Sequence, residues 1–141
     1  MSAYTTDGKV AHYSAQDDVN TKLAKVIGQK FLDYREKWDK ANRFELETEF
    51  PLFLHLDLNQ KCNYRCPQCI IAYPEEVSKY YKGSSLEFDL YKNVIDEGSR
   101  YNCPSVSVQG NNEPLLIPNL EDYIKYASDR GFIDIMFNTN G

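Results

Sequence analysis

The sequence of 141 residues lacks several features that define whole classes of protein. Its longest unbroken apolar run, residues 69–73, is far short of the roughly 20 residues that a membrane-spanning helix needs. The first 18 residues contain no apolar stretch of the kind that a secretory signal requires. Lys and Arg number 16 against 21 Asp and Glu, so the net charge is −5. These absences predict a cytoplasmic protein without a membrane contact, and they disfavour nucleic acid as a partner.

Cysteine is scarce but clustered. Three of the four cysteines, Cys62, Cys66 and Cys69, lie within eight residues in a Cx3Cx2C pattern, and Cys103 stands apart. A disulfide framework is not expected in a chain without an export signal, so the cluster indicates metal ligands or redox groups. Thiolates suit iron–sulfur clusters, zinc or Cu(I).

The N-terminal third divides into a tail and a helical segment. Residues 1–16 are polar and carry no hydrophobic period, which predicts a flexible tail. Residues 17–50 are expected to form one amphipathic helix to about residue 42 and then a lead-in strand. The helix prediction depends on apolar residues at spacings of three and four, from Val19 to Trp38.

Residues 51–141 alternate between strand and helix patterns. Period-two alternation predicts strands within 51–59, 105–110 and 132–141, and helical periods between them predict helices after Glu87 and over 120–130. The segment 60–86 is expected to be a long connection. This order predicts an α/β fold with parallel strands and right-handed crossovers. Three strands leave both sheet edges open, so we expect the N-terminal piece of a larger domain.

The carboxyl ends of these strands are rich in polar groups. They read NQKCNYRCPQC, QGNNEPLL and NTNG, and ligands gather at this end of parallel sheets. His55 and Asp57 in the first strand, with the alternate polar residues of the other two strands, are expected to face a ligand-holding lumen. They can equally be structural side chains that are hydrogen-bonded and bind no ligand.

Two metal readings of the cysteines stay open at this point. Three thiolates in one loop can hold three corners of a [4Fe–4S] cube, whose fourth iron can then bind a small molecule. A structural zinc site needs four protein ligands and would have to recruit Cys103 or His55. Cys103 is expected at the opposite end of the sheet, which disfavours zinc.

Three motifs in order make the sequence resemble the radical S-adenosylmethionine (radical SAM) enzymes over residues 51–141. The first is the cysteine motif. The second, Gly110-Asn111-Asn112-Glu113-Pro114, resembles the family's Gly-Gly-Glu-Pro motif, with asparagines in place of glycines. The third, Thr139-Asn140-Gly141, resembles a turn that follows the third strand in this family.

The resemblance implies a partial (β/α) barrel, truncated after about three βα units and preceded by the N-terminal amphipathic helix. It implies that Cys62, Cys66 and Cys69 ligate a [4Fe–4S] cluster whose open iron chelates S-adenosylmethionine. Reductive cleavage would yield methionine and a 5′-deoxyadenosyl radical that abstracts hydrogen from an unknown substrate, with an electron donor such as a flavodoxin or ferredoxin. The cofactor contacts would come from Gln68, Gly110, Asn111, Asn112 and Glu113.

Two further expectations concern completeness. The cysteine loop and the lead-in before the first strand also look similar to relatives with a C-terminal cluster-binding extension, the SPASM type. The parent protein is expected to be an enzyme, whereas this piece alone is expected to be inactive.

Overall fold

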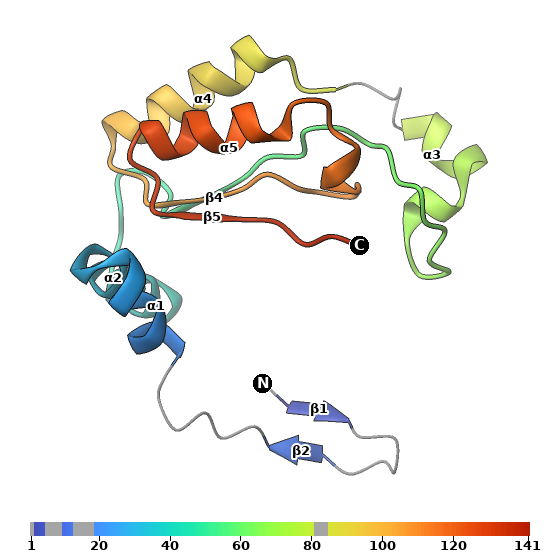
Figure 1. Cartoon of the computed structure of the whole chain (residues 1–141). Coiled ribbons are helices and arrows are strands. Elements are labelled where there is room, and N and C mark those ends of the chain that lie inside the picture. The colour runs from blue at the N-terminus through green and yellow to red at the C-terminus, as the bar shows by residue number, and fades with distance from the viewer. Residues whose placement is uncertain (1, 5–9, 13–18, 81–84) are drawn as a thin grey trace.

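The computed structural model describes residues 2–4, 10–12, 19–80 and 85–141 (Figure 1). No helix in these described ranges has the length and apolarity needed to cross a membrane. The elements in chain order are β1 (Ser2–Tyr4), β2 (Val10–His12), α1 (Val19–Ile27), α2 (Gln29–Asn42), β3 (Phe53–His55), η1 (Ile70–Ala72), α3 (Pro74–Tyr80), α4 (Phe88–Arg100), β4 (Ser105–Ser107), η2 (Pro114–Leu116), α5 (Leu120–Asp129) and β5 (Asp134–Met136).

The central sheet has the parallel order β3-β4-β5 that the sequence predicts. Its register aligns Leu54 with Val106 and Val106 with Ile135. Single hydrogen bonds carry the pairing beyond the three-residue ladders, from Leu56 N–H to Ser107 O and from Val108 N–H to Met136 O. The crossovers contain α4 and α5, which lie side by side on one face of the sheet (Figure 1). The α/β class is therefore confirmed, with a small sheet of short strands.

The main core lies between that sheet face and the two helices. Tyr91 and Ile95 of α4 are completely buried, as are Val106 and Val108 at the sheet. Tyr91 also donates a 2.8 Å hydrogen bond from its hydroxyl to the carbonyl of Tyr123, and burial raises the pKa of that hydroxyl. Leu90 of the same helix lies on its exposed side, with 53% of its surface accessible.

The predicted single helix over 17–42 is wrong, because it is divided into α1 and α2 at Gly28. Gly28 has a φ of 99°, a left-handed conformation that glycine tolerates and that ends an α-helix. The predicted lead-in strand over 44–50 is also absent, since Phe44 has a positive φ and is 97% exposed. In the predicted N-terminal tail, β1 and β2 pair antiparallel, and the rest of 1–16 lies outside the described residues.

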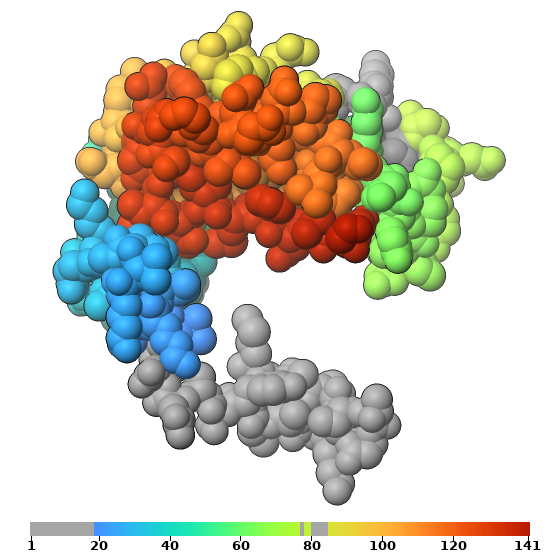
Figure 2. All heavy atoms as spheres, in the orientation of Figure 1, coloured from blue at the N-terminus to red at the C-terminus, as the bar shows by residue number. Residues whose placement is uncertain are grey.

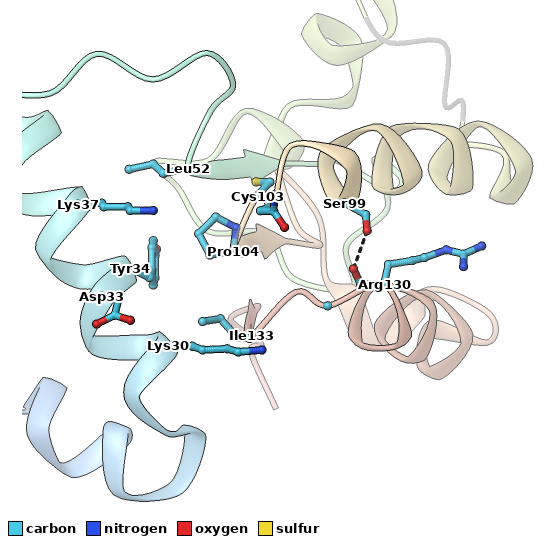
Figure 3. Close-up of a pocket in the computed structure, with 12 residues that line it drawn as sticks. Lys30, Asp33, Tyr34, Lys37, Leu52, Ser99, Cys103, Pro104, Arg130 and Ile133 are labelled. Carbon is cyan, nitrogen blue, oxygen red and sulfur yellow. Dashed lines mark hydrogen bonds between the residues drawn. The ribbon is translucent and has the colours of Figure 1, made fainter.

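Helix α2 packs beside the amino ends of β3 and β4. The ring of Trp38 meets the ring of Phe53 edge-on at 5.9 Å, and Tyr34 lies against Ser105. Burial, as the largest cause, raises the pKa of Tyr34. A pocket of about 380 Å³ remains between α2 and the sheet, where Lys30 and Lys37 extend from the helix and Cys103 lies on the opposite wall (Figure 3).

The connection over 60–86 is more structured than predicted, because it contains η1 and α3. Helix α3 starts with Pro74 and has Glu75 and Glu76 in its first turn, both of which favour a helix N-terminus. The preceding segment lies next to the last residues of the chain (Figure 2), and the side chain of Asn140 donates a hydrogen bond to the sulfur of Cys62.

Candidate functional site

The carboxyl ends of the three central strands surround one pocket of about 270 Å³. The three motifs singled out in the sequence all contribute to its lining, although they lie far apart in the chain. The residues that line it are Cys62, Tyr64, Cys66, Cys69, Ile71, Gln109, Gly110, Asn111, Asn112, Glu113, Asn138, Thr139 and Asn140. The fold therefore brings together every predicted cofactor contact and metal ligand except Gln68.

The cysteine segment is held in shape by short local hydrogen bonds. Cys69 N–H donates to Cys66 O at 2.9 Å, and Tyr64 N–H donates to the Sγ of Cys62 at 3.4 Å. The Arg65 guanidinium closes the loop by donating to the carbonyls of Cys62 and Tyr64, each at 2.9 Å. All three thiols are free and partly exposed toward the pocket. The loop therefore presents three available sulfur atoms.

The Gly110 turn is built by side-chain amides. Gly110 N–H donates to Asn112 Oδ1 at 2.8 Å, and Asn112 Nδ2 donates to Asn59 Oδ1 at 3.4 Å. Asn59 is buried and also accepts from Lys61 N–H at 3.0 Å, which ties the turn to the start of the cysteine loop. Asn111 and Asn112 do not adopt positive φ, so the two departures from glycine cause no backbone strain here.

Gly110 is required for a steric reason. A Cβ at this position would meet the side chain of Asp57, whose own Cβ would lie only 2.7 Å away. Asp57 follows β3, and the backbone N–H of Asn111 interacts with its carboxylate. Partial burial of its carboxyl raises the pKa of Asp57, against the opposing effects of Asn111 and of nearby His55.

Glu113 is the most deeply buried acid of the pocket, with 4% of its surface exposed. Burial alone would raise its pKa, but three hydrogen bonds outweigh that effect, and the net pKa is lowered. The donors are Thr139 Oγ1 at 2.7 Å, Asn140 N–H at 2.8 Å and Leu115 N–H at 3.0 Å. Its own N–H donates to Lys61 O at 2.9 Å. Glu113 thus joins the second motif to the third as a carboxylate.

Asn140 joins the third motif to the first. Its Nδ2 donates to Asn63 Oδ1 at 3.0 Å and to Cys62 Sγ at 3.7 Å. The sequence marks residues 139–141 as a motif, but it does not reveal that these residues clamp the other two motifs. The only local signal is their place directly after a predicted strand.

The predicted lumen positions differ in exposure. His55 and Asp57 are exposed, whereas Ser105 and Ser107 are buried. Ser105 is covered from the side of α2, and its hydroxyl donates to Asp134 O at 2.9 Å. The expectation of a uniformly wet strand face is therefore wrong at the amino end of β4.

The residues that line the pocket include three thiols but neither of the fourth ligands that a structural zinc site would recruit. Within the described ranges, no group of three or more His, Cys, Asp or Glu side chains converges to hold a metal ion. Neither Cys103 nor His55, the fourth ligands that zinc would need, lines the pocket. Cys103 is buried at the other end of the sheet. A four-iron cube spreads its thiolates around its corners, so three cysteines lining one pocket suit it without meeting at a point.

Gln68 is the predicted cofactor contact that the fold does not bring to the pocket wall. It is exposed in the cysteine loop, outside the residues that line the pocket. Gln109, which the sequence singles out only as part of a polar strand face, does line the wall and accepts a hydrogen bond from Asn138 N–H.

Comparison with known proteins finds no matching family model. Curated relatives do match part of the chain. It is 34% identical over 92 residues to a GTP 3′,8-cyclase of Campylobacter jejuni subsp. jejuni, covering 63% of this chain and 27% of that protein. It is 29% identical over 91 residues to the 7,8-dihydro-6-hydroxymethylpterin dimethyltransferase of Methanocaldococcus jannaschii, covering 64% and 17%.

A third relative is the tungsten-containing aldehyde ferredoxin oxidoreductase cofactor-modifying protein of Pyrococcus furiosus, 24% identical over 90 residues, with 63% of this chain and 24% of that protein covered. This chain therefore spans about a quarter or less of the length of these relatives.

A solved structure shares the fold. The crystal structure of BtrN in complex with AdoMet and 2-DOIA superposes with a TM-score of 0.51 at 22% identity, over 60% of this chain and 33% of that one. These relatives are radical SAM enzymes, and the partial coverage fits an N-terminal portion. The resemblance carried by the three motifs is thus confirmed, and the chain is similar to the N-terminal portion of radical SAM enzymes.

Proposed function

We propose that this chain is the N-terminal part of a radical SAM catalytic domain and contributes three βα units to a (β/α) barrel. Cys62, Cys66 and Cys69 would hold a [4Fe–4S] cluster, and S-adenosylmethionine would lie against the turn at residues 110–113. The observation that carries this proposal is the convergence of all three motifs on one pocket. When bound, the cluster would supply the electron that cleaves S-adenosylmethionine to methionine and a radical able to abstract hydrogen from a substrate.

The protein's own contribution is the supply of ligands. Three thiols from one loop line the pocket, while Cys103 and His55 lie outside its lining. Three ligands to a four-iron cluster leave one iron for a small molecule. The short hydrogen bonds of the loop would hold the thiolates in place while the ligand binds.

The Gly110 turn would form the neighbouring wall for the methionine end of S-adenosylmethionine. This turn lines the pocket, and Asn112 and Asn59 brace it. Glu113, held as a carboxylate by three donors, adds negative charge beside a position where an amino group would bind. Gln68 stays a proposed contact through its backbone.

The whole enzyme would need more than this chain. Because the chain spans 27% and 17% of the length of two curated relatives, the substrate site and the remaining barrel strands are proposed to lie in further sequence. We expect the chain alone to bind a cluster without sustained turnover. An electron donor such as a flavodoxin or ferredoxin, a cytoplasmic location and a SPASM-type extension stay predictions of the sequence.

The test is anaerobic reconstitution of the chain with iron and sulfide, followed by EPR of the dithionite-reduced protein. We expect a reduced [4Fe–4S] signal that changes when S-adenosylmethionine is added. Cys66→Ala should lose this signal, and the matched change Cys103→Ala should keep it, because Cys103 lies at the opposite end of the sheet. Stoichiometric zinc without a cluster, or a full cluster in Cys66→Ala, would overturn the proposal.

A further inference from the structure

We infer that Asn140 is a positioning residue that sets the reduction potential of the cluster through the sulfur of Cys62. The inference rests on the proposed function, since it requires a cluster on the three cysteines. It extends that function by assigning a separate task to a residue 78 positions away from the thiol that it contacts.

The geometry of Asn140 uses both hydrogens of its amide nitrogen. One partner is Asn63 Oδ1, 3.0 Å away, which fixes the plane of the amide. The other is the Sγ of Cys62 at 3.7 Å, a distance suited to a hydrogen bond to sulfur. The backbone N–H of Asn140 donates to Glu113 Oε2 at 2.8 Å. The side chain is therefore anchored at its base and at its tip, with one donor directed at sulfur.

The three sulfurs differ in their surroundings. Cys62 Sγ also accepts from Tyr64 N–H at 3.4 Å, so it has two donors. Within the part of the chain that the structure describes, the thiols of Cys66 and Cys69 accept no hydrogen bond. Of the three sulfur atoms, that of Cys62 therefore receives both of these hydrogen bonds.

Hydrogen bonds to ligating sulfur change the potential in a known direction. A donor withdraws electron density from the thiolate, which stabilises the reduced cluster and raises its reduction potential. Of the two donors on Cys62, the one from Tyr64 belongs to the backbone and survives any substitution. The one from Asn140 belongs to a side chain, so the chain can set the potential at this residue without altering a ligand.

The experiment is a redox titration of the reconstituted chain, monitored by EPR in the absence of S-adenosylmethionine. Asn140→Ala removes the donor, and we expect its midpoint potential to be more negative than that of the unaltered protein. Asn140→Asp replaces the donor by a negative charge at the same size, and its midpoint should be lower still. Asn93→Ala makes the same chemical change at an exposed position on α4 and should leave the midpoint unchanged.

The outcomes separate this inference from the proposed function. A cluster with equal midpoints in the unaltered protein and in Asn140→Ala overturns the inference and leaves the proposed function standing. Failure of the unaltered protein to bind a cluster refutes the proposed function and the inference with it. If Asn140→Ala assembles no cluster, Asn140→Thr, which has a hydroxyl donor, is compared with Asn140→Val, which has the same shape without one. A higher midpoint for the threonine variant supports the inference, and equal midpoints overturn it.

Discussion

The helix-covered face of the sheet and its carboxyl edge are held together by different forces. On the helix-covered face, apolar side chains such as Ile95 and Val106 are sealed between the strands and α4 and α5. At the carboxyl edge, which comprises residues 57, 59–62, 109–113 and 138–140, the contacts are hydrogen bonds of amides and of the carboxylates of Glu113 and Asp57. The contrast indicates that stability and ligand binding are carried by separate sets of residues, which substitutions can separate.

The largest effect on stability is expected inside the helix-covered face. Ile95→Ala removes a fully buried side chain and should lower the free energy of unfolding by about 2–5 kcal/mol. Leu90→Ala, on the exposed side of the same helix, should change it by about 0.5 kcal/mol or less. Urea unfolding measures both. Equal losses would contradict the assigned packing of α4.

The next largest effect is expected at Glu113 on the carboxyl edge. Glu113→Ala leaves the N–H groups of Leu115 and Asn140 and the hydroxyl of Thr139 without their acceptor. The cost should be about 1–3 kcal/mol in urea unfolding, and cluster loading should fall sharply because the second and third motifs separate. Glu113→Gln keeps one acceptor oxygen and should lose less on both measures. Full cluster loading in Glu113→Ala would show that the hydrogen bonds between Glu113 and the third motif are not needed for cluster binding.

The buried Cys103 and the pocket cysteine Cys66 are expected to differ in two measured properties, stability and iron content. The expected changes in stability are smaller than those at Ile95 and Glu113. Cys103→Ser places a hydroxyl in a site that is 3% exposed and should cost about 1–2 kcal/mol of stability, with iron content unchanged. Cys66→Ser at the partly exposed pocket should change the stability of the metal-free chain by about 0.5 kcal/mol or less, and should lose the iron. Iron analysis and urea unfolding of both variants test this prediction. Loss of iron in Cys103→Ser, with iron retained in Cys66→Ser, would refute the assignment of Cys66 to the pocket and of Cys103 to the opposite end of the sheet.

The smallest expected effect is a pair of opposite pH dependences on the carboxyl edge. The folded-state pKa of Glu113 is lowered, so its contribution to stability is complete above the unfolded-state pKa and is lost as pH falls through the folded-state pKa. The folded-state pKa of Asp57 is raised, so its contribution to stability is complete below the unfolded-state pKa and is lost as pH rises through the folded-state pKa. In stability measured across the acid range, Glu113→Gln should remove a rising slope and Asp57→Asn a falling one. If both substitutions removed slopes of the same sign, the assigned direction of the pKa shift of Glu113 or of Asp57 would be wrong.

Local patterns predicted the elements whose own residues determine them. The alternation at Leu54, Val106 and Ile135 located the three strands, and cysteine spacing singled out three thiols that line one pocket. The period of α2 was read correctly, but its continuation through Gly28 was not, because an apolar spacing does not report the φ of a glycine within it. The residues that favour the start of α3, Pro74 and the two glutamates after it, are present in the sequence, but the whole segment 60–86 was predicted as a connection.

The parts of the site that sequence did not predict depend on partners distant in the chain. Nothing near Glu113 indicates that Thr139 will donate to it across 26 residues, and nothing near Cys62 indicates Asn140. These residues meet because the parallel arrangement brings the carboxyl ends of the strands to the same edge of the sheet. Gln68 shows the opposite case, where a position inferred from a motif lies outside the pocket lining once the loop has folded.

The contact between Cys62 and Asn140 also has a consequence for the order of events during synthesis. These residues are 78 positions apart, so the cysteine loop leaves the ribosome long before its clamp exists. At about 5–20 residues per second, the delay lasts roughly 4 to 16 seconds. Closing so long a loop costs entropy that only the docked third strand can offset. The three thiols therefore emerge as an open segment, and the pocket that they line is complete only after the end of β5 is in place.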